Sequence, residues 1–409
     1  MQSTKTSEPI RLKDALLRSR CGAGAVGIGF TPQTVRSAYV HVPFCRHRCG
    51  YCDFALVAGR GDLVEAYLEG VAAELAELPW SFELDTLYVG GGTPTFLSPG
   101  QLRRLFALLT DRLALRRGAE VTIEANPADL LDARKRAALA DLPVTRISLG
   151  VQSLDPAVLK TLERDHRPAE IHEVFAALRA ARSDWQLACD LIFAVPGQTI
   201  ASWQNTLQGV IALQPDHVSA YGLTFEKGTA FWSRRRRGVL TELPEDEQLR
   251  MYDVAIDRLT AAGFEHYEIS NLARPGCRSR HNLAYWTFQP YLAFGPGAAW
   301  FVGGVRGTNH RSVFTWLKRV HAGVSPVAEF EILDAEQQAR DRLWLGLRLR
   351  EGVELETFRQ ETGFCVDELL GARLREHVQQ GRLTVCDGRL MLTREGLHVA
   401  DSVFADCVG

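Results

Sequence analysis

The sequence predicts an α/β fold: a partial (β/α)6 barrel followed by a C-terminal α+β, winged-helix-like domain. From about residue 36, short β-branched or aromatic runs alternate with helical patterns. This alternation implies a parallel sheet with right-handed crossovers. The sequence contains six such units, too few to close a barrel of the usual eight, so we expect an open, partial barrel. A change of pattern after about residue 310 predicts the second domain.

Short apolar runs mark the strands of the predicted sheet. Because these runs are short and apolar, we expect both of their faces to be buried. Ser98 followed by Pro99 is a typical helix start, since serine caps the first turn and proline fits its first position. The strands are expected at 38–42, 86–89, 121–124, 145–149, 187–193 and 217–223, and the helices at 61–78, 98–114, 128–140, 155–182 (with a break near Pro168), 199–213 and 244–262.

The C-terminal part has the pattern of a small separate domain. Asp387-Gly388, between runs at 382–386 and 389–393, is a strong signal for a two-residue β-hairpin. Helical patterns at 335–348, 353–360, 366–379 and 394–406 surround this hairpin. We therefore divide the chain into an N-terminal extension (1–35), the barrel (36–270), a linker or substrate-contacting segment (271–330) and the winged-helix-like domain (331–409).

The composition is that of an ordinary globular protein and excludes some partners. The 409 residues are 46% hydrophobic and 23% charged, with a formal net charge of −2, which argues against nucleic acid or an anionic membrane bound by bulk electrostatics. No apolar stretch reaches the roughly 18 residues that a membrane span needs. Residues 1–20 lack the apolar core of a signal peptide, and Glu8 and Asp14 count against a mitochondrial transit peptide. We expect a cytoplasmic monomer or dimer.

Three of the nine cysteines, Cys45, Cys49 and Cys52, lie within eight residues, directly after the first predicted strand. In a long chain without a signal peptide, such crowding favours metal binding over disulfides. Three thiolates at this spacing can surround one cuboidal iron–sulfur cluster, and they leave one iron without a protein ligand. The alternatives are a zinc site completed by His41 or His47, or three unrelated core cysteines.

Other predicted strand ends carry glycine or charged residues. The run 90–95 (Gly-Gly-Gly-Thr-Pro-Thr) follows the second strand, where glycine permits close approach to a ligand, although such runs often form tight turns. Glu124 ends the third strand, where a carboxylate can accept hydrogen bonds from a ribose or an ammonium group, or cap a helix. Asp190 interrupts an otherwise apolar fifth strand, so its charge needs a buried partner.

At these residues the sequence resembles the radical S-adenosylmethionine proteins, and more narrowly the branch of the oxygen-independent coproporphyrinogen III oxidases and the HemW-type heme chaperones. The resemblance begins near residue 36 and continues to the C-terminus. It implies a [4Fe–4S] cluster bound by Cys45, Cys49 and Cys52, with S-adenosylmethionine on the open iron. It also implies that the cofactors are contacted by Tyr39, Tyr51, Gly91, Gly92, Thr93, Glu124, Gln152, Arg164, Asp190 and Gly222.

Two features separate the oxidases from the chaperones. The oxidases have a fourth cysteine two residues after the third, where this chain has Phe54. The chaperones have the motif H-N-x-x-Y-W, present here at 281–286. His281 offers an imidazole that can bind heme iron, beside aromatic residues that can stack on a porphyrin, or it is a hydrogen-bonded structural histidine.

The resemblance therefore implies a HemW-type chaperone that binds heme and passes it to acceptor proteins. The rival functions are oxidative decarboxylation of coproporphyrinogen III and a radical reaction on another substrate. The chain departs from the family at Ala293, which replaces a glycine, and at Ala299 and Trp300, which replace His-Ser. The basic run Arg234–Arg237 is expected in a loop, either solvated or pairing with porphyrin propionates.

Overall fold

The computed structural model describes residues 10–21 and 35–409. Most of the expected N-terminal extension lies outside these residues, apart from helix α1 (Leu12–Cys21). Helix α1 contacts β12, a strand at one side of the main sheet, and buries Ala15 and Leu16 completely. No helix among the described residues is both long and apolar enough to cross a membrane.

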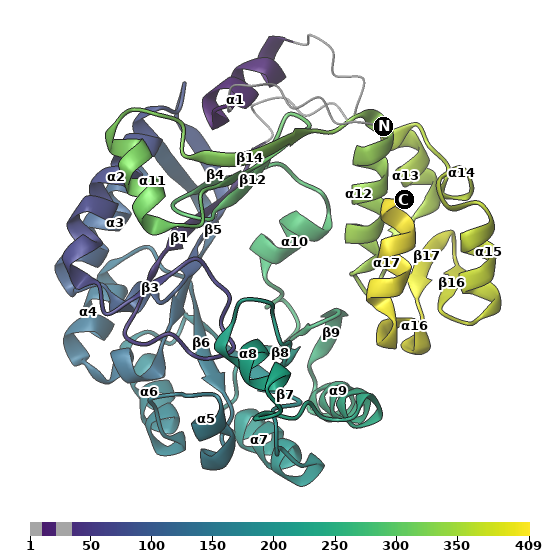
Figure 1. Ribbon diagram of the computed structural model, residues 1–409, viewed down its shortest axis with the longest axis horizontal. Coiled ribbons are helices and arrows are strands. Elements are labelled where there is room, and N and C mark those ends of the chain that lie inside the picture. Colours follow the sequence, from purple (N-terminus) through teal and green to yellow (C-terminus); the bar gives the residue numbers. More distant parts are fainter. Residues whose placement is uncertain (1–9, 22–34) are drawn as a thin grey trace.

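Six consecutive parallel strands form the centre of a twelve-stranded sheet. Figure 1 shows these strands as an arc with helices along its outer side. The arc confirms the predicted partial barrel and all six predicted strands. In spatial order the strands are β1 (Ser37–Val42), β4 (Phe82–Gly91), β5 (Leu113–Ala125), β6 (Arg146–Gln152), β7 (Gln186–Phe193) and β8 (His217–Gly222).

Helices follow the strands as the sequence predicts. Ser98 accepts a hydrogen bond from Gln101 N and completes a capping box at the start of α3. The expected break near Pro168 separates two helices, because proline favours the first turn of a helix over its interior. The helices of this layer are α2 (Val64–Ala76), α3 (Pro99–Arg112), α4 (Ala133–Asp141), α5 (Pro156–Thr161), α6 (Pro168–Ala181), α7 (Ile200–Ala212) and α9 (Glu245–Ala261).

The strands are not apolar on both faces, which corrects the expectation from their sequence. Side chains alternate between the two faces of a strand. In β5, Val121 and Ile123 belong to the main apolar core, whereas Thr122 and Glu124, which alternate with them, line a cavity inside the barrel. The inner face is polar because the barrel encloses a cavity instead of a packed core.

Segment 271–330 does more than connect two domains. Strand β11 pairs in parallel with β1, β12 to β14 continue from it antiparallel, and β10 joins the opposite side of the sheet beside β8. The segment thus extends the sheet at both ends. Its elements are β10 (Asn271–Ala273), α10 (Arg280–Trp286), β11 (Tyr291–Phe294), β12 (Ala299–Val302), β13 (Val305–Asn309), α11 (Val313–His321) and β14 (Val327–Ile332).

Two of the family departures lie under helix α1. Ala293 and Trp300 are 1% exposed and form an apolar cluster with Ile10 and Ala15 of the N-terminal segment. Ala299 is exposed at the start of β12. Replacement of a glycine by Ala293 and of a serine by Trp300 supplies the apolar surface on which the N-terminal segment packs.

The basic run lies on a helix, not in the loop that we expected. Thr229 accepts a hydrogen bond from Trp232 N and starts α8 (Ala230–Arg236), which includes most of the run. A threonine at the N-cap satisfies a free N–H of the first turn, so Thr229 is a local signal for a helix at this position. The run ends at Arg237, which is the C-cap residue of α8.

The C-terminal residues form their own apolar core beside the barrel. Helix α12 lies on the side of this domain that faces the barrel (Figure 1). The predicted hairpin is confirmed, and Asp387 and Gly388 both have positive φ, as its turn requires. The region expected as a helix at 353–360 begins with a short strand instead. The elements are α12 (Ala335–Leu347), β15 (Val353–Glu354), α13 (Leu355–Thr362), α14 (Val366–Leu370), α15 (Ala372–Gln379), β16 (Leu383–Cys386), β17 (Arg389–Leu392), α16 (Arg394–His398) and α17 (Ala400–Val408).

Truncation of a side chain on the outer face of a barrel strand should destabilise the fold. Leu149 of β6 is fully buried in the main core. We expect Leu149→Ala to lower the free energy of unfolding by about 2–5 kcal/mol, through lost burial and a residual cavity. Leu17→Ala is the matched control, because Leu17 is 40% exposed. Urea unfolding followed by circular dichroism measures both, and equal small effects would contradict the assignment of Leu149 to the core.

Candidate functional site

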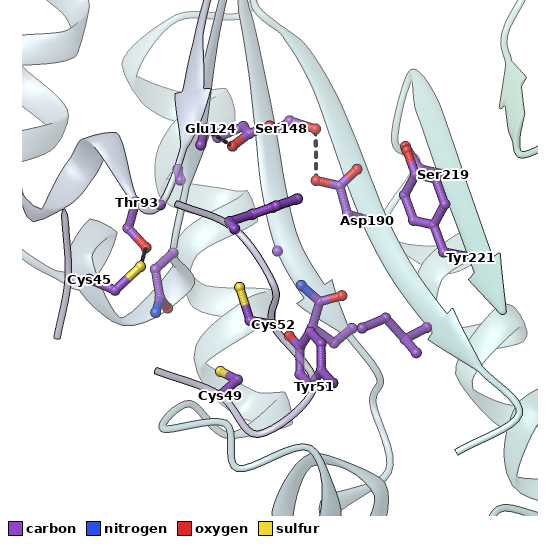
Figure 2. Close-up of a pocket in the computed structure, with 18 of the residues that line it drawn as sticks. Cys45, Cys49, Tyr51, Cys52, Thr93, Glu124, Ser148, Asp190, Ser219 and Tyr221 are labelled. Carbon is purple, nitrogen blue, oxygen red and sulfur yellow. Dashed lines mark hydrogen bonds between the residues drawn. The ribbon is translucent and has the colours of Figure 1, made fainter. Parts of the chain in front are cut away.

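The three clustered cysteines lie at the mouth of the cavity inside the barrel, which has a volume of about 470 Å³ (Figure 2). Cys45 ends the short strand β2 (Phe44–Cys45), which pairs with β3 (Val57–Ala58), so the cysteine loop is closed at its base. Within the loop, Cys52 N donates to Cys49 O at 3.1 Å, a turn that brings these two residues together. Cys45 Sγ lies 3.2 Å from Thr93 Oγ1 of the neighbouring loop.

The glycine-rich loop after β4 packs directly on the cysteine loop. Gly92 N donates to Val42 O at 2.8 Å, and Thr93 N donates to Phe44 O at 2.7 Å. A Cβ on Gly92 would lie 2.8 Å from Phe44 O, so a side chain there would separate the two loops. Gly91 has a φ of +108° and donates its N–H to Glu124 Oε2 at 2.8 Å. The glycines therefore hold two strand-end loops together.

A buried aspartate joins three of the loops around the cavity. Asp129, in the 3-10 turn Pro127–Leu131, is 1% exposed. It accepts hydrogen bonds from Arg46 Nε at 2.8 Å, within the cysteine loop, and from Thr95 Oγ1 at 3.1 Å, in the glycine-rich loop. Lys135 Nζ of α4 lies 3.6 Å from the same carboxylate, and burial lowers the pKa of this lysine. Asp129 is thus a charged anchor for the cysteine loop.

The side chains on the inner faces of the strands form the walls of the cavity. Register places Glu124 of β5 beside Ser148 of β6, and Asp190 of β7 beside Ser219 of β8. Ser148 donates to Asp190 Oδ2 at 2.9 Å, so the charge of Asp190 has the partner that the sequence required (Figure 2). Several further residues that were not predicted line the cavity, although their alternation with apolar neighbours marks them in the sequence: Tyr88, Thr122, Arg146, Ser148, His217, Ser219 and Tyr221.

Two carboxyl groups inside the cavity have raised pKa values. Burial raises the pKa of Glu124 to about 7, and the charge of Asp190 adds to this shift, while hydrogen bonds from Tyr88 and Gly91 oppose it. Burial also raises the pKa of Asp190. Carboxylates held in this way favour a ligand that brings positive charge or hydrogen-bond donors into the cavity.

Arg164 connects the cavity wall to the cysteine loop. Its guanidinium donates to Gly150 O at 3.1 Å and lies 3.8 Å from Cys49 Sγ. Gln152, at the end of β6, has a φ of +62° and approaches Gly150 closely. Tyr51 lines the cavity and packs against Phe231 of α8 at a ring distance of 6.0 Å.

The cavity fits the cofactors that the resemblance implies. Three half-buried thiols border it, and thiolates are the usual ligands of iron–sulfur clusters. Three buried polar atoms of its lining have no hydrogen-bond partner among the described residues: Thr122 Oγ1, Arg164 Nε and His217 Nδ1. Since buried polar groups are normally paired, these atoms are suited to a polar ligand.

The structure favours the cluster over the zinc alternative. Both ring nitrogens of His41 are engaged, Nδ1 with Tyr39 Oη at 2.9 Å and Nε2 with Ala55 O at 2.7 Å. His47 Nε2 lies 3.5 Å from a carboxylate oxygen of Glu163. Within residues 10–21 and 35–409, no group of three or more His, Cys, Asp or Glu is close enough to hold a single metal ion. A cuboidal cluster needs no such group, because each thiolate binds a different iron.

Two residues expected at the site lie outside the cavity lining. Tyr39 is on the inner face of β1, bound to His41 and tilted against Tyr88 at a ring distance of 6.0 Å. His281 is 1% exposed; its Nδ1 lies 2.8 Å from Thr86 Oγ1 and its Nε2 lies 2.7 Å from Tyr285 Oη. Both ring nitrogens are hydrogen-bonded, which favours the alternative of a structural histidine over a heme ligand. The other predicted residues line the cavity: Tyr51, Gly91, Gly92, Thr93, Glu124, Gln152, Arg164, Asp190 and Gly222, with Cys45, Cys49 and Cys52.

The basic run of α8 is largely engaged within the protein. Arg234 forms a 2.5 Å ion pair with Glu163, and Arg235 a 2.7 Å pair with Glu242. The guanidinium of Arg236 lies 4.9 Å from the centre of the Trp232 ring. These contacts attach α8 to the segment that carries Glu163. They leave little of the basic run free to bind porphyrin propionates.

Comparison with known proteins agrees with this geometry. The Radical SAM superfamily matches residues 39–209, and the HemN C-terminal domain matches 333–399. The heme chaperone HemW of Lactococcus lactis subsp. lactis is 37% identical over 375 residues, which are 91% of this chain and 97% of that protein. The heme chaperone HemW of Bacillus subtilis is 31% identical over 379 residues, 92% of this chain and 100% of the relative.

A solved structure shares the fold. The coproporphyrinogen III oxidase HemN of Escherichia coli, a radical SAM enzyme, superposes with a TM-score of 0.84 over 100% of this chain and 96% of that chain. The two sequences are 20% identical, so the likeness concerns the fold alone.

Loss of the Asp129 carboxylate should loosen the cysteine loop. We expect Asp129→Ala to cost about 3–5 kcal/mol of stability, because Lys135 would be left buried without its partner. The variant should also lose iron and sulfide faster to a chelator than the parent protein does. Asp141→Ala is the control, since the Asp141 side chain is 65% exposed in its pair with Arg103. Equal rates of cluster loss in both variants would contradict an anchoring role.

Binding of S-adenosylmethionine should depend on the charge of Glu124. Its pKa is raised to about 7, so the carboxyl takes up a proton as the pH falls through neutrality and loses the charge that attracts a cation. We expect the affinity to fall roughly three- to tenfold from about pH 8 to about pH 6. Anaerobic calorimetry measures this change. Glu124→Gln should bind weakly at both pH values with a smaller pH dependence, and an undiminished dependence would assign the titration to another group.

Proposed function

The chain belongs to the family of the HemW heme chaperones, within the radical SAM superfamily, and from this premise we propose that it binds heme and passes it to acceptor proteins. The observation that carries this proposal is the similarity to HemW chaperones over nearly the whole length of both chains. Phe54 supports it, because the oxidases of the same branch have a cysteine at this position. We also propose the domain division 1–35, 36–270, 271–330 and 331–409 as its functional organisation.

The cofactors of the protein are a [4Fe–4S] cluster, S-adenosylmethionine and heme. We assign Cys45, Cys49 and Cys52 as the cluster ligands. Burial raises the pKa of Cys45 to about 12 and also raises that of Cys52, so binding of iron must displace the thiol protons at neutral pH. When bound, such a cluster would be able to supply an electron to S-adenosylmethionine.

The residues around the cysteines then have distinct tasks in binding S-adenosylmethionine. Glu124 and Asp190 present carboxylate oxygens inside the barrel to its ammonium group and ribose hydroxyls. Arg164, whose Nε has no partner among the described residues, offers a donor close to Cys49. The glycine-rich loop brings backbone close to the cysteines and leaves no room for side chains there. These groups orient the cosubstrate and exclude water from the open iron.

Anaerobic heme titration of the reconstituted full-length protein tests the proposal. We expect about one heme per chain, transfer of that heme to an apo-heme protein, and no protoporphyrinogen from coproporphyrinogen III. Cys49→Ser should lose its iron and sulfide, because the substitution removes one of the proposed cluster ligands. Cys386→Ser is the control, since Cys386 is exposed in the hairpin of the C-terminal domain. Failure to bind heme, or substantial protoporphyrinogen formation, would overturn the chaperone function.

A further inference from the structure

A second cavity, of about 310 Å³, lies between the barrel and the C-terminal domain. Helix α10 and strands β11 to β13 form one side of it, and α12 forms the other. Figure 1 shows α10 between the arc of strands and α12. Its lining is mostly aromatic, unlike the polar lining of the cluster cavity: Tyr285, Trp286, Phe288, Tyr291, Phe301 and Trp344.

The aromatic residues of this cavity are not simply core residues. Trp286 and Trp344, one from each side, are only half-buried. The indole N–H of Trp344 donates to Asp341 at 3.0 Å, but that of Trp286 has no partner among the described residues. A buried indole N–H is normally paired, so an unpartnered one beside a cavity points to a missing ligand. Aromatic faces around such a space suit a flat apolar ring system.

Arginine side chains provide positive charge beside the aromatic surface. Arg348 has its guanidinium 4.3 Å from the centre of the Trp286 ring and reaches a carboxylate, that of Glu268, only at 4.0 Å. Its Nε has no partner among the described residues. Arg306, in the lining, pairs with Asp341 and Glu331, each at 2.8 Å. Arg348 is not among the lining residues but lies against the Trp286 ring, so it can pair with a carboxylate placed at the edge of the cleft.

The cluster cavity is a poor site for heme. Its volume of about 470 Å³ is required for the cluster and S-adenosylmethionine. Its inner wall carries Glu124, Asp190 and Arg146, so it suits a polar ligand better than a flat apolar ring system. His281 is buried with both nitrogens bound, so it offers no ligand at either place.

We propose that heme binds in the aromatic cleft between α10, β11–β13 and α12, stacked between Trp286 and Trp344, with a propionate on Arg348. This inference rests on the proposed function as a heme chaperone. None of the described residues that line the cleft is histidine, cysteine or methionine. The porphyrin is held mainly through its ring, and an acceptor with a stronger iron ligand can remove it.

Two substitutions in the cleft test this site by anaerobic heme titration of the full-length protein with its cluster in place. Trp344→Ala removes a stacking face, and we expect the affinity to fall about tenfold or more. Gln289→Trp places bulk in the cleft at an exposed position and should weaken binding similarly without disturbing the core. Trp232→Ala is the matched control, a half-buried tryptophan on α8, and should leave heme affinity unchanged. Iron content and S-adenosylmethionine affinity should match the parent in all three.

The outcomes separate this inference from the function on which it rests. If the parent protein binds heme and Gln289→Trp binds it equally well, the cleft is not the site, although the chaperone function stands. If the parent binds no heme, the function itself fails. If Trp344→Ala does not fold, Gln289→Trp decides alone. An equal loss of affinity in Trp232→Ala would place heme near the cysteine loop and overturn the proposal.

Discussion

The alternation of side chains along parallel strands is the constraint from which both the fold and the site follow. In the central strands, alternate residues that face the helices are mostly apolar, as Val121 and Ile123 are. The residues between them face the inside of an arc that does not close, so they need no packing partner across a barrel centre. Polar and charged side chains can therefore occupy these positions, and the same pattern that folds the protein also builds the walls of its cavity.

The sequence was sufficient for the elements whose signals are local. All six central strands, the capped helix after Ser98, the break near Pro168 and the Asp387-Gly388 hairpin follow from neighbouring residues. Strand β11 could not be predicted in the same way, because its parallel partner β1 is brought beside it only by the tertiary fold. The pairing of β11 with β1 spans more than half of the chain. Gly303-Gly304, which joins β12 to β13 in a hairpin, is by contrast a local turn signal.

The candidate site shows the same division. The cysteines and the glycine-rich loop are recognisable from spacing, and the structure brings them together. The role of Asp129 could not be recognised from the sequence, because its partners Arg46, Thr95 and Lys135 come from three separate segments. The surroundings of His281 could not be predicted either. Its motif suggested an available imidazole, but availability depends on Thr86 and Tyr285, which occupy both nitrogens and are visible only in three dimensions.

The aromatic cleft has one wall on the barrel side, with Trp286, and the other on the C-terminal domain, with Trp344. Whatever fills such a space contributes to the docking of the two parts, and by thermodynamic linkage their docking contributes equally to retention of the ligand. A partner protein that shifts α12 away from α10 would thereby lower the affinity of the cleft without touching its contents. The domain boundary is then a means of release as well as a place of binding.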